Sequence, residues 1–307
     1  MLTYVVRRVL VAVPTLLGVA TVVFSLLRLL PGDPASVIAG PTATPEATAN
    51  IRHQLGLDLP LWQQYLSFLG RLLRGDLGIS TRTGSPVVNE IFTRVPYTAE
   101  LAVISLILAI AVGVAAGVIA STRRSGGADL GISGSAVFGV SMPTFWLGLM
   151  LIIVFAVRLR VLPAAGSDQG VQSLILPSVT LALFSMGLLT RQTRSAMLEV
   201  LGQDFVRTAR AKGAGRRIVL VKHALRNAML PVVTTIGLQF GALLSGAVLT
   251  ETVFAWPGVG RLLVDSIGSR DYPVIQGVVL LLSVSFIVIN LLTDLVYAYV
   301  DPRIRYG

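Results

Sequence analysis

The sequence predicts an all-α polytopic membrane protein with six transmembrane helices. Of its 307 residues, 54% are hydrophobic and only 13% are charged, and the mean hydropathy is +0.78. Apolar runs of about 20 residues, the length that crosses a bilayer core, recur along the chain. This composition leaves no room for a large soluble domain, although a chain of this length would otherwise suit one or two.

The chain divides into three regions. Residues 1–30 hold the N-terminus and the first span, 31–98 form the only long polar region, and 99–307 hold the other spans. The expected spans are 9–29, 99–120, 135–157, 174–189, 232–249 and 274–296. We interpret the first as a span rather than a cleaved signal peptide, because the following Pro31-Gly32-Asp33-Pro34 does not resemble a small-residue cleavage site.

The long polar region is expected to contain two short helices on the extracytoplasmic side. The first has Thr44 before Pro45 at its start and Gly56 beyond its end. Proline at the first helical position and glycine after the last one are typical of helix ends.

The second of these helices is expected over 60–74. Its apolar residues recur at helical spacing and form one stripe. The aromatic members of the stripe are Trp62, Tyr65 and Phe68. They suit a bilayer interface, and a small extracytoplasmic cap packed on itself fits the pattern equally well.

Two of the expected spans contain a proline. Pro143 lies within 135–157, and Pro177 lies near the start of 174–189. Proline removes a backbone donor and frees a carbonyl, which is tolerated in lipid only where protein or water satisfies these groups. We therefore expect these helices to face partners.

The charged residues follow a topology. Six spans place both termini on one side, together with the 121–134 turn and the 191–228 loop, and this side holds a large excess of Lys and Arg. The opposite side holds basic and acidic residues in equal number. The basic excess predicts that both termini are cytoplasmic. It also accounts for the net charge of +10, so no basic face is left for nucleic acid.

Several kinds of enzyme site are excluded by missing residues. The sequence has no G-x-x-x-x-G-K-[ST] loop for ATP phosphates, no H-E-x-x-H for a catalytic zinc, and no cysteine. Ser141 could be an intramembrane nucleophile, but the histidines His53 and His223 both fall outside the spans and cannot serve it as a base. We expect a chain that is not an enzyme and has no metal or cofactor of its own.

Asp294 is the acidic residue that lies well inside an expected span, with Asn290 four residues before it on the same helix face. An acid within the membrane is a candidate proton or ion site, which would make the chain an ion-coupled secondary transporter. The alternative is a buried hydrogen-bonding pair near the cytoplasmic end of the helix, which we favour.

A basic stretch over 202–227 interrupts the spans. Asp204 can accept hydrogen bonds from free backbone N–H groups at a helix start, and Gly213 can adopt the left-handed conformation that closes the same helix. A helix of about two turns is marginal alone, so its order should come from packing on neighbours or on another protein. Topology alone would explain the charge of this loop but does not require helix caps.

A second amphipathic stretch follows over 216–226. Ile218, Val221 and Leu225 are expected to form one apolar stripe along it. The short helix and this stretch together favour a docking element over a simple topology signal.

The basic stretch resembles the cytoplasmic EAA loop of ABC importer permeases. Its version is similar to the dipeptide/oligopeptide branch (DppB/OppB type), in which an arginine, here Arg207, stands where the general motif has glutamate. The resemblance covers nearly the whole chain in order. The matching motifs are 31–34 (PGDP), 55–57 (LGL), 75–78 (GDLG), 96–101 (PYTAEL), 204–213 (DFVRTARAKG), 223–228 (HALRNA), 230–231 (LP), Glu251, 254–260 (FAWPGVG), 271–273 (DYP), 290–294 (NLLTD) and 301–303 (DPR).

The resemblance implies a permease fold of the type I ABC importers and a set of partners. These are a second, homologous permease, one or two ABC ATPase subunits that bind ATP and Mg, an extracytoplasmic substrate-binding protein, and membrane lipid. The substrate is expected to be a di- or oligopeptide, with nickel chelates or glutathione as alternatives. The location implied is the bacterial inner membrane.

Two groups of site residues follow from the resemblance. A coupling helix that docks on the ATPase is expected to use Phe205 and Val206 for apolar contact, Arg207 and Arg210 for ion pairs, and Ala209 and Gly213 for close approach. The full coupling set is Asp204, Phe205, Val206, Arg207, Thr208, Ala209, Arg210 and Gly213.

A gate loop over 251–273 is expected on the outer side, where Trp256 would meet the binding protein over the mouth of the pathway. The residues proposed for this role are Glu251, Trp256, Pro257 and Gly258. Packing of the loop against its own subunit is the alternative.

Overall fold

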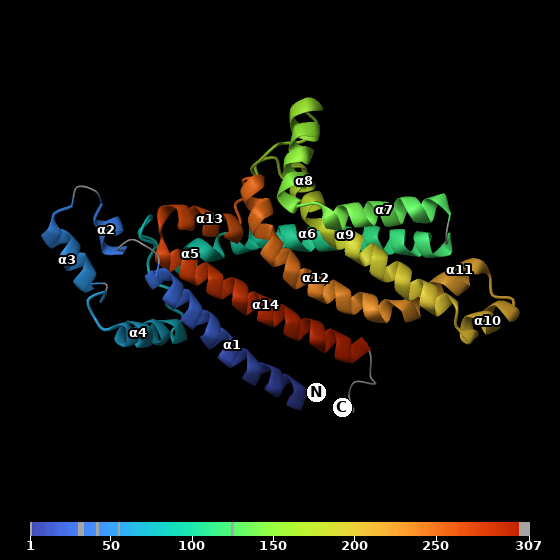
Figure 1. The fold of residues 1–307 in the computed structure, drawn as a ribbon, viewed down its shortest axis with the longest axis horizontal. Helices are drawn as coiled ribbons and strands as arrows, with labels where there is room; N and C mark the ends of the chain where they lie inside the picture. The colour runs from blue at the N-terminus through green and yellow to red at the C-terminus, as the bar shows by residue number, and fades with distance from the viewer. Residues whose placement is uncertain (1, 30–33, 41–42, 55, 124–125, 301–307) are drawn as a thin grey trace. The chain divides into compact units, whose positions relative to one another are not determined.

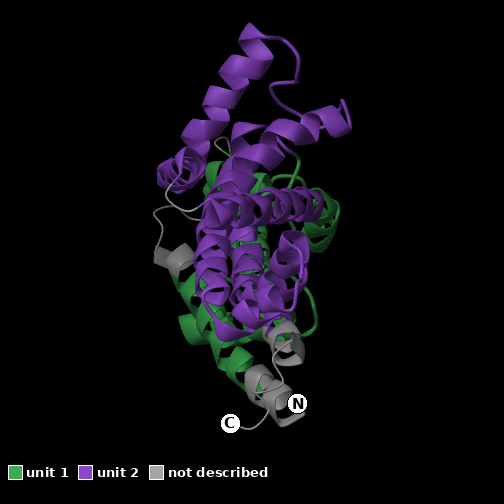
Figure 2. Cartoon of the chain, turned by 90° about the vertical axis from the view of Figure 1, so that its right-hand side faces the viewer, with its two compact units in different colours: residues 1–97, 257–287 green, residues 98–256, 288–307 purple. Residues whose placement is uncertain are grey.

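The computed structural model describes residues 2–29, 34–40, 43–54, 56–123 and 126–300. These residues are mostly helical, and the β-structure described among them is one isolated bridge between Ile79 and Pro86. The chain forms two compact units (Figure 2): Met1–Tyr97 with Pro257–Ile287, called unit 1, and Thr98–Trp256 with Val288–Gly307, called unit 2. The helical content confirms the predicted fold class.

Unit 1 holds the first apolar helix and the long polar region (Figure 1). Its helices are α1 (Leu2–Leu29), α2 (Pro34–Ala39), α3 (Pro45–Gln54), α4 (Leu61–Leu73), α5 (Val87–Phe92), α13 (Val259–Ser269) and the first part of α14 (Tyr272–Val300). The two helices predicted here, α3 and α4, are confirmed. Thr44 caps α3, since its Oγ1 accepts a hydrogen bond from Ala47 N–H at 3.2 Å.

The sequence did not predict the remaining short helices of unit 1. Each of α2 and α5 is six residues long, too short to show a helical period. Helix α13 lies within 251–273, which we expected to be a loop rich in proline and glycine. It packs with α5 and α14 in one core of Val87, Ile91, Val259, Leu262, Val274 and Val278.

Unit 2 is built around one long helix. Its elements are α6 (Val95–Thr122, from Thr98), α7 (Gly127–Ser141), α8 (Thr144–Leu151), the π-helix η1 (Ile152–Arg158), α9 (Val171–Leu201), α10 (Asp204–Ala211), α11 (Arg216–Ile218), the π-helix η2 (Val219–Leu225), α12 (Arg226–Val253) and the end of α14. Helix α9 packs on α7, α8 and α12.

Glycine permits the closest approach between the helices of unit 2. A Cβ atom added at Gly117 of α6 would lie 2.6 Å from the Cβ of Thr193 on α9. One added at Gly237 of α12 would lie 2.0 Å from Cγ2 of Thr293 on α14. Both distances are far below contact distance, so α6 on α9 and α12 on α14 pack backbone against side chain.

Four helical segments in the described part of the chain are long and apolar enough to cross a membrane: Val87–Thr122, Val171–Leu201, Arg216–Leu244 and Tyr272–Thr293. Helix α1 contributes a shorter apolar stretch, Leu10–Ser25. The predicted span 135–157 is broken. At Pro143 the chain bends by 107° between Gly127–Ser141 and Thr144–Arg158, because proline cannot continue the backbone hydrogen bonds of the preceding helix.

The loop predicted over 191–228 begins later than the sequence suggested, which corrects the predicted end of the preceding span. Helix α9 continues twelve residues past the expected end at 189 and ends at Leu201. Arg194, placed in the loop from its charge, lies on this extension and donates two hydrogen bonds to Asp129 of α7, at 2.6 and 2.8 Å. Because Asp129 pairs with its charge, Arg194 can lie within the packed part of α9, and the helix continues past it.

Candidate functional site

The candidate site is the short helix α10, which follows the end of α9. Its C-terminal end has the predicted geometry: Gly213 has φ of +82°, in the left-handed region. The N–H of Gly213 donates to the carbonyl of Arg210 at 3.0 Å, and the N–H of Ala214 donates to that of Ala209 at 3.1 Å. This pair of bonds is the Schellman motif, so the prediction of a glycine-closed helix end is confirmed.

The N-terminal end of α10 differs from the prediction. Gln203 occupies the N-cap position and makes no side-chain cap hydrogen bond, and Asp204 is the first helical residue. The Asp204 carboxylate lies 3.5 Å from Arg207 Nη1, and both side chains are exposed. Asp204 therefore stabilises the helix through its negative charge in the first turn rather than by capping.

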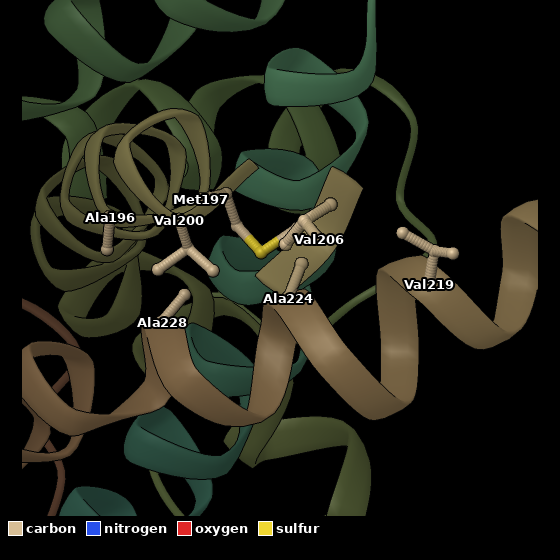
Figure 3. Close-up of a cluster of buried hydrophobic side chains, with 7 residues drawn as sticks. All are labelled: Ala196, Met197, Val200, Val206, Val219, Ala224 and Ala228. Atoms are coloured by element: carbon tan, nitrogen blue, oxygen red, sulfur yellow. The ribbon is translucent and has the colours of Figure 1, made fainter. Parts of the chain in front are cut away.

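Val206 anchors α10 to its own chain. The side chain is fully buried and lies in a cluster with Met197 and Val200 of α9 (Figure 3). The other members of the cluster are Ala196, Val219, Ala224 and Ala228. Ala209, one turn later, packs partly against it. The expectation that Val206 contacts a partner is therefore wrong, because no part of its side chain is accessible.

The outer side of α10 remains open. Arg207 and Thr208 are exposed opposite the anchored face, and Phe205 and Arg210 are exposed on its two flanks. Phe205 is 39% exposed on this otherwise charged surface of the helix. The helix thus presents one aromatic side chain and two guanidinium groups on a backbone that Val206 holds in place.

The residues of the apolar stripe predicted after α10 do not share one environment. Ile218 and Val221 are 52% and 58% exposed, whereas Leu225 packs partly against the cluster around Val206, in which Val219 and Ala224 are buried. The reason is the π-helix η2, whose i→i+5 hydrogen bonds bring residues five apart onto the same side. A period of 3.6 residues selects the wrong set, and no sequence signal we know marks the wider turn.

An open groove with a volume of about 430 Å³ adjoins α10 in unit 2. It is lined by Ser121, Thr122, Leu201, Arg210, Ala214, Arg216, Val219 and Leu220. Arg210 and Arg216 give it a basic rim, so the surface around α10 combines positive charge with apolar contact area.

The second predicted group of residues lies at the other end of α12. Glu251 and Trp256 are buried in unit 2. Thr98 Oγ1 donates to Glu251 Oε1 at 2.6 Å. Trp256 packs with Leu101, Leu174, Leu181, Leu243 and Ala247. The expectation that Trp256 meets the binding protein is corrected, because its indole is 2% exposed and packs on its own subunit.

Pro257 and Gly258, the other residues of the predicted gate loop, belong to unit 1, where Pro257 is half-buried and Gly258 is buried before α13. The side chain of Asp294 lies outside the described residues. In the described part of the chain, no group of three or more His, Cys, Asp or Glu residues could hold a metal ion.

Comparison with known proteins gives full-length matches. The family model of the binding-protein-dependent transport system inner membrane component matches residues 110–306, and the N-terminal model of the same family matches 1–102. The dipeptide transport system permease proteins DppB of Alkalihalophilus pseudofirmus and Escherichia coli K12 are 43% and 44% identical over the whole chain and at least 99% of their own length. The glutathione transport system permease protein GsiC of Escherichia coli K12 is 48% identical over the full length of both chains.

Solved structures agree on the fold. The inward-facing MetNI methionine ABC transporter has a chain with a TM-score of 0.59 at 20% identity, covering 69% of this chain and 96% of its own. An amino acid ABC transporter with histidines has a TM-score of 0.52 at 13% identity, covering 76% and 98%. The chain therefore belongs to the binding-protein-dependent transport system inner membrane components, and it is a DppB/OppB-type permease of an ABC transporter.

Proposed function

We propose that the chain forms half of the pathway through which an ABC importer carries di- or oligopeptides across the bacterial inner membrane. Full-length relatives named for dipeptide and for glutathione support a small peptide as substrate, since glutathione is itself a modified tripeptide. The second half of the pathway is a homologous permease. An extracytoplasmic binding protein delivers the peptide, and both termini of the permease lie in the cytoplasm.

The single observation that carries the mechanism is the anchoring of α10. Val206 fixes the helix to α9 and to the η2–α12 segment, while Phe205, Arg207 and Arg210 remain exposed. Partner ATPase subunits, one or two per complex, bind ATP and Mg and seat this exposed surface in a groove. When they close, the movement of α10 passes directly to two long helices as a rigid-body displacement.

The basic surface of α10 also indicates the chemistry of the groove on the ATPase that binds it. Arg207 and Arg210 favour carboxylates on the ATPase, and Phe205 favours an apolar pocket between them. Thr208, exposed on the same side, permits close approach. Val206 and Ala209 pack against the rest of the permease and hold α10 in place, and they do not contact the ATPase.

At the opposite end of unit 2, Glu251 and Trp256 hold the pathway mouth together instead of binding the delivery protein. The buried carboxylate of Glu251 accepts a hydrogen bond from Thr98, which ties the end of α12 to the start of α6. Towards the end of α13, Ile267 is 57% exposed, and Arg270, which follows the helix, is also exposed. This helix end is the part of the loop that a binding protein can reach.

Transport by the assembled complex tests the proposal. We expect vesicles that contain both permeases and the ATPase subunits to take up a labelled dipeptide only when the binding protein and hydrolysable ATP are present. An excess of glutathione as competitor separates the two substrate classes suggested by the relatives. Uptake by this chain alone, driven by an ion gradient and lost in Asp294→Asn, would instead make it a secondary transporter.

A further inference from the structure

Helix α4 of unit 1 carries two apolar faces, of which one is packed. Tyr65 and Phe68 lie against Phe24 of α1, with ring centroids 5.3 and 5.7 Å apart. The Tyr65 hydroxyl also shares a hydrogen bond with Thr21 Oγ1 at 2.6 Å. Leu69 and Leu72 pack partly into the same cluster, which includes Leu280 of α14. Helix α4 is therefore fixed on the sides of α1 and α14.

The second apolar face of α4 is open. Trp62, Leu66 and Leu73 are 62%, 57% and 89% exposed, and Leu59, just before the helix, is 44% exposed. Within the helix, the spacings of four and seven residues place Trp62, Leu66 and Leu73 along one line. Three large apolar side chains in such a line are not scattered exposed residues but a continuous surface.

The polar side chains of α4 occupy a separate face. Gln63, Ser67 and Arg71 follow one another at steps of four residues, and Arg74 lies at the end of the same face. Ser67 and both arginines are exposed. The circumference of α4 thus has three parts: a face packed on α1 and α14, an open apolar face beside it, and a polar, basic face.

The packed face also gives the depth of α4 relative to its neighbours. Phe24 lies five residues before the end of α1 at Leu29, which corresponds to about 8 Å along the helix. Leu280 lies eight residues after the start of α14 at Tyr272, or about 12 Å. Tyr272–Thr293 of α14 is long and apolar enough to cross a membrane, and α1 contributes the shorter apolar stretch Leu10–Ser25. A bilayer core is about 30 Å thick. The contacts of α4 with both helices therefore lie about 8 and 12 Å from the helix ends, less than half the thickness of a bilayer core.

We infer that α4 is an interfacial helix embedded in the outer leaflet of the bilayer, with its open apolar face in contact with lipid acyl chains. Leu59, Trp62, Leu66 and Leu73 insert into the hydrocarbon, and Arg71 and Arg74 reach the phosphate groups. This division of aromatic and leucine residues on one face and arginine on the other is typical of helices that lie in a membrane surface. The polar segment between the first two spans is thus partly a membrane-bound element.

The position of α4 relative to the ends of α1 and α14 favours lipid over a soluble protein as the partner of its open apolar face. A water-soluble binding protein would have to reach about 10 Å below the ends of α1 and α14, where lipid surrounds the permease. A second permease could cover the face from the side, and that outcome is separable by experiment.

Single-cysteine spin labels test the inference directly, because the sequence contains no cysteine. Labels are placed at Trp62→Cys, Leu66→Cys and Leu73→Cys, with Ser67→Cys on the polar face as the matched control. Val11→Cys on the exposed side of α1 provides a lipid reference. The complete transporter is reconstituted in vesicles of phosphatidylethanolamine and phosphatidylglycerol. Collisions with oxygen, which concentrates in lipid, and with a water-soluble nickel chelate are then measured.

We expect the ratio of oxygen to nickel accessibility at 62, 66 and 73 to be severalfold higher than at 67 and close to that at 11. Nickel accessibility at 62, 66 and 73 equal to that at 67 would show a water-facing helix and overturn the inference. Protection from both reagents in the complete transporter, but not in the permease alone, would show that a partner subunit covers the face and would overturn it equally.

Discussion

The anchoring of α10 predicts a measurable effect for Val206→Ala. The substitution removes two methyl groups from a side chain that is fully buried among Met197, Val200 and Ala224. At about 0.8 kcal/mol for each buried carbon, with an added cavity term, the lost packing is about 2 kcal/mol. Since a short helix has little stability of its own, this loss falls on the equilibrium between docked and undocked α10. The undocked population should rise roughly 30-fold.

Hydrogen exchange of the amides in 204–213 measures that equilibrium, because exchange proceeds through local opening. In the reconstituted complex we expect exchange in Val206→Ala to be faster by roughly the same 30-fold factor. Peptide uptake per ATP hydrolysed should fall, because an undocked helix does not move α9. Thr208→Ala on the exposed face is the matched control, and it should change the free energy of opening by less than about 0.5 kcal/mol.

Equal exchange rates in Val206→Ala and the unmodified chain would show that the buried valine does not hold the helix. Faster exchange with unchanged uptake per ATP would show that α10 is anchored as described but does not transmit movement. Either result would refute the reasoning at a defined step.

Two further substitutions test the packing of α12 on α14 and the C-terminal end of α10, the proposed coupling helix. Gly237→Ala should destabilise the permease, because the added Cβ would lie 2.0 Å from Cγ2 of Thr293. We expect a lower melting temperature for this variant and an unchanged one for the control Gly131→Ala, whose added Cβ would have no neighbour within 4 Å. Gly213→Trp should uncouple ATP hydrolysis from uptake without loss of membrane insertion, because it puts a bulky side chain at a position with φ of +82° beside α10. Gly215→Trp, at a φ of −61°, should retain coupling, and equal uptake in both variants would contradict a close contact at Gly213.

Local chemistry made part of this structure predictable. The start of α3 at Pro45, the amphipathic α4 and the glycine-closed end of α10 follow from residues within a few positions of one another. Signals of this kind depend on backbone conformation and on the i to i+4 spacing, both of which can be read along the chain.

Features that depend on distant residues were not predictable. The sequence shows that Arg194 is charged, but not that Asp129, 65 positions earlier, provides its partner and allows α9 to continue. Trp256 in a loop rich in proline and glycine suggests an exposed contact, whereas a pocket formed by α6, α9 and α12 buries it. In both cases contacts with residues distant in sequence determined the structure. The local sequence was compatible both with a loop and with a continued helix at Arg194, and both with an exposed and with a buried Trp256.

The π-helix η2 shows a third kind of failure. Its buried residues Val219 and Ala224 are five apart, so the search for a 3.6-residue period selected Ile218 and Val221 on the exposed side. The apolar character of the segment was correctly predicted, but the face that packs was not.

The most direct test of the proposed mechanism is a photo-cross-link from the exposed face of α10. A photoreactive residue at Arg207 is introduced into the permease of the complete transporter, and a second at exposed Thr252, at the far end of α12, serves as the control. We predict a covalent adduct with an ATPase subunit from position 207 and none from position 252. An intact, ATP-hydrolysing complex that gives no ATPase adduct from 207 would contradict the assignment of α10 as the coupling helix.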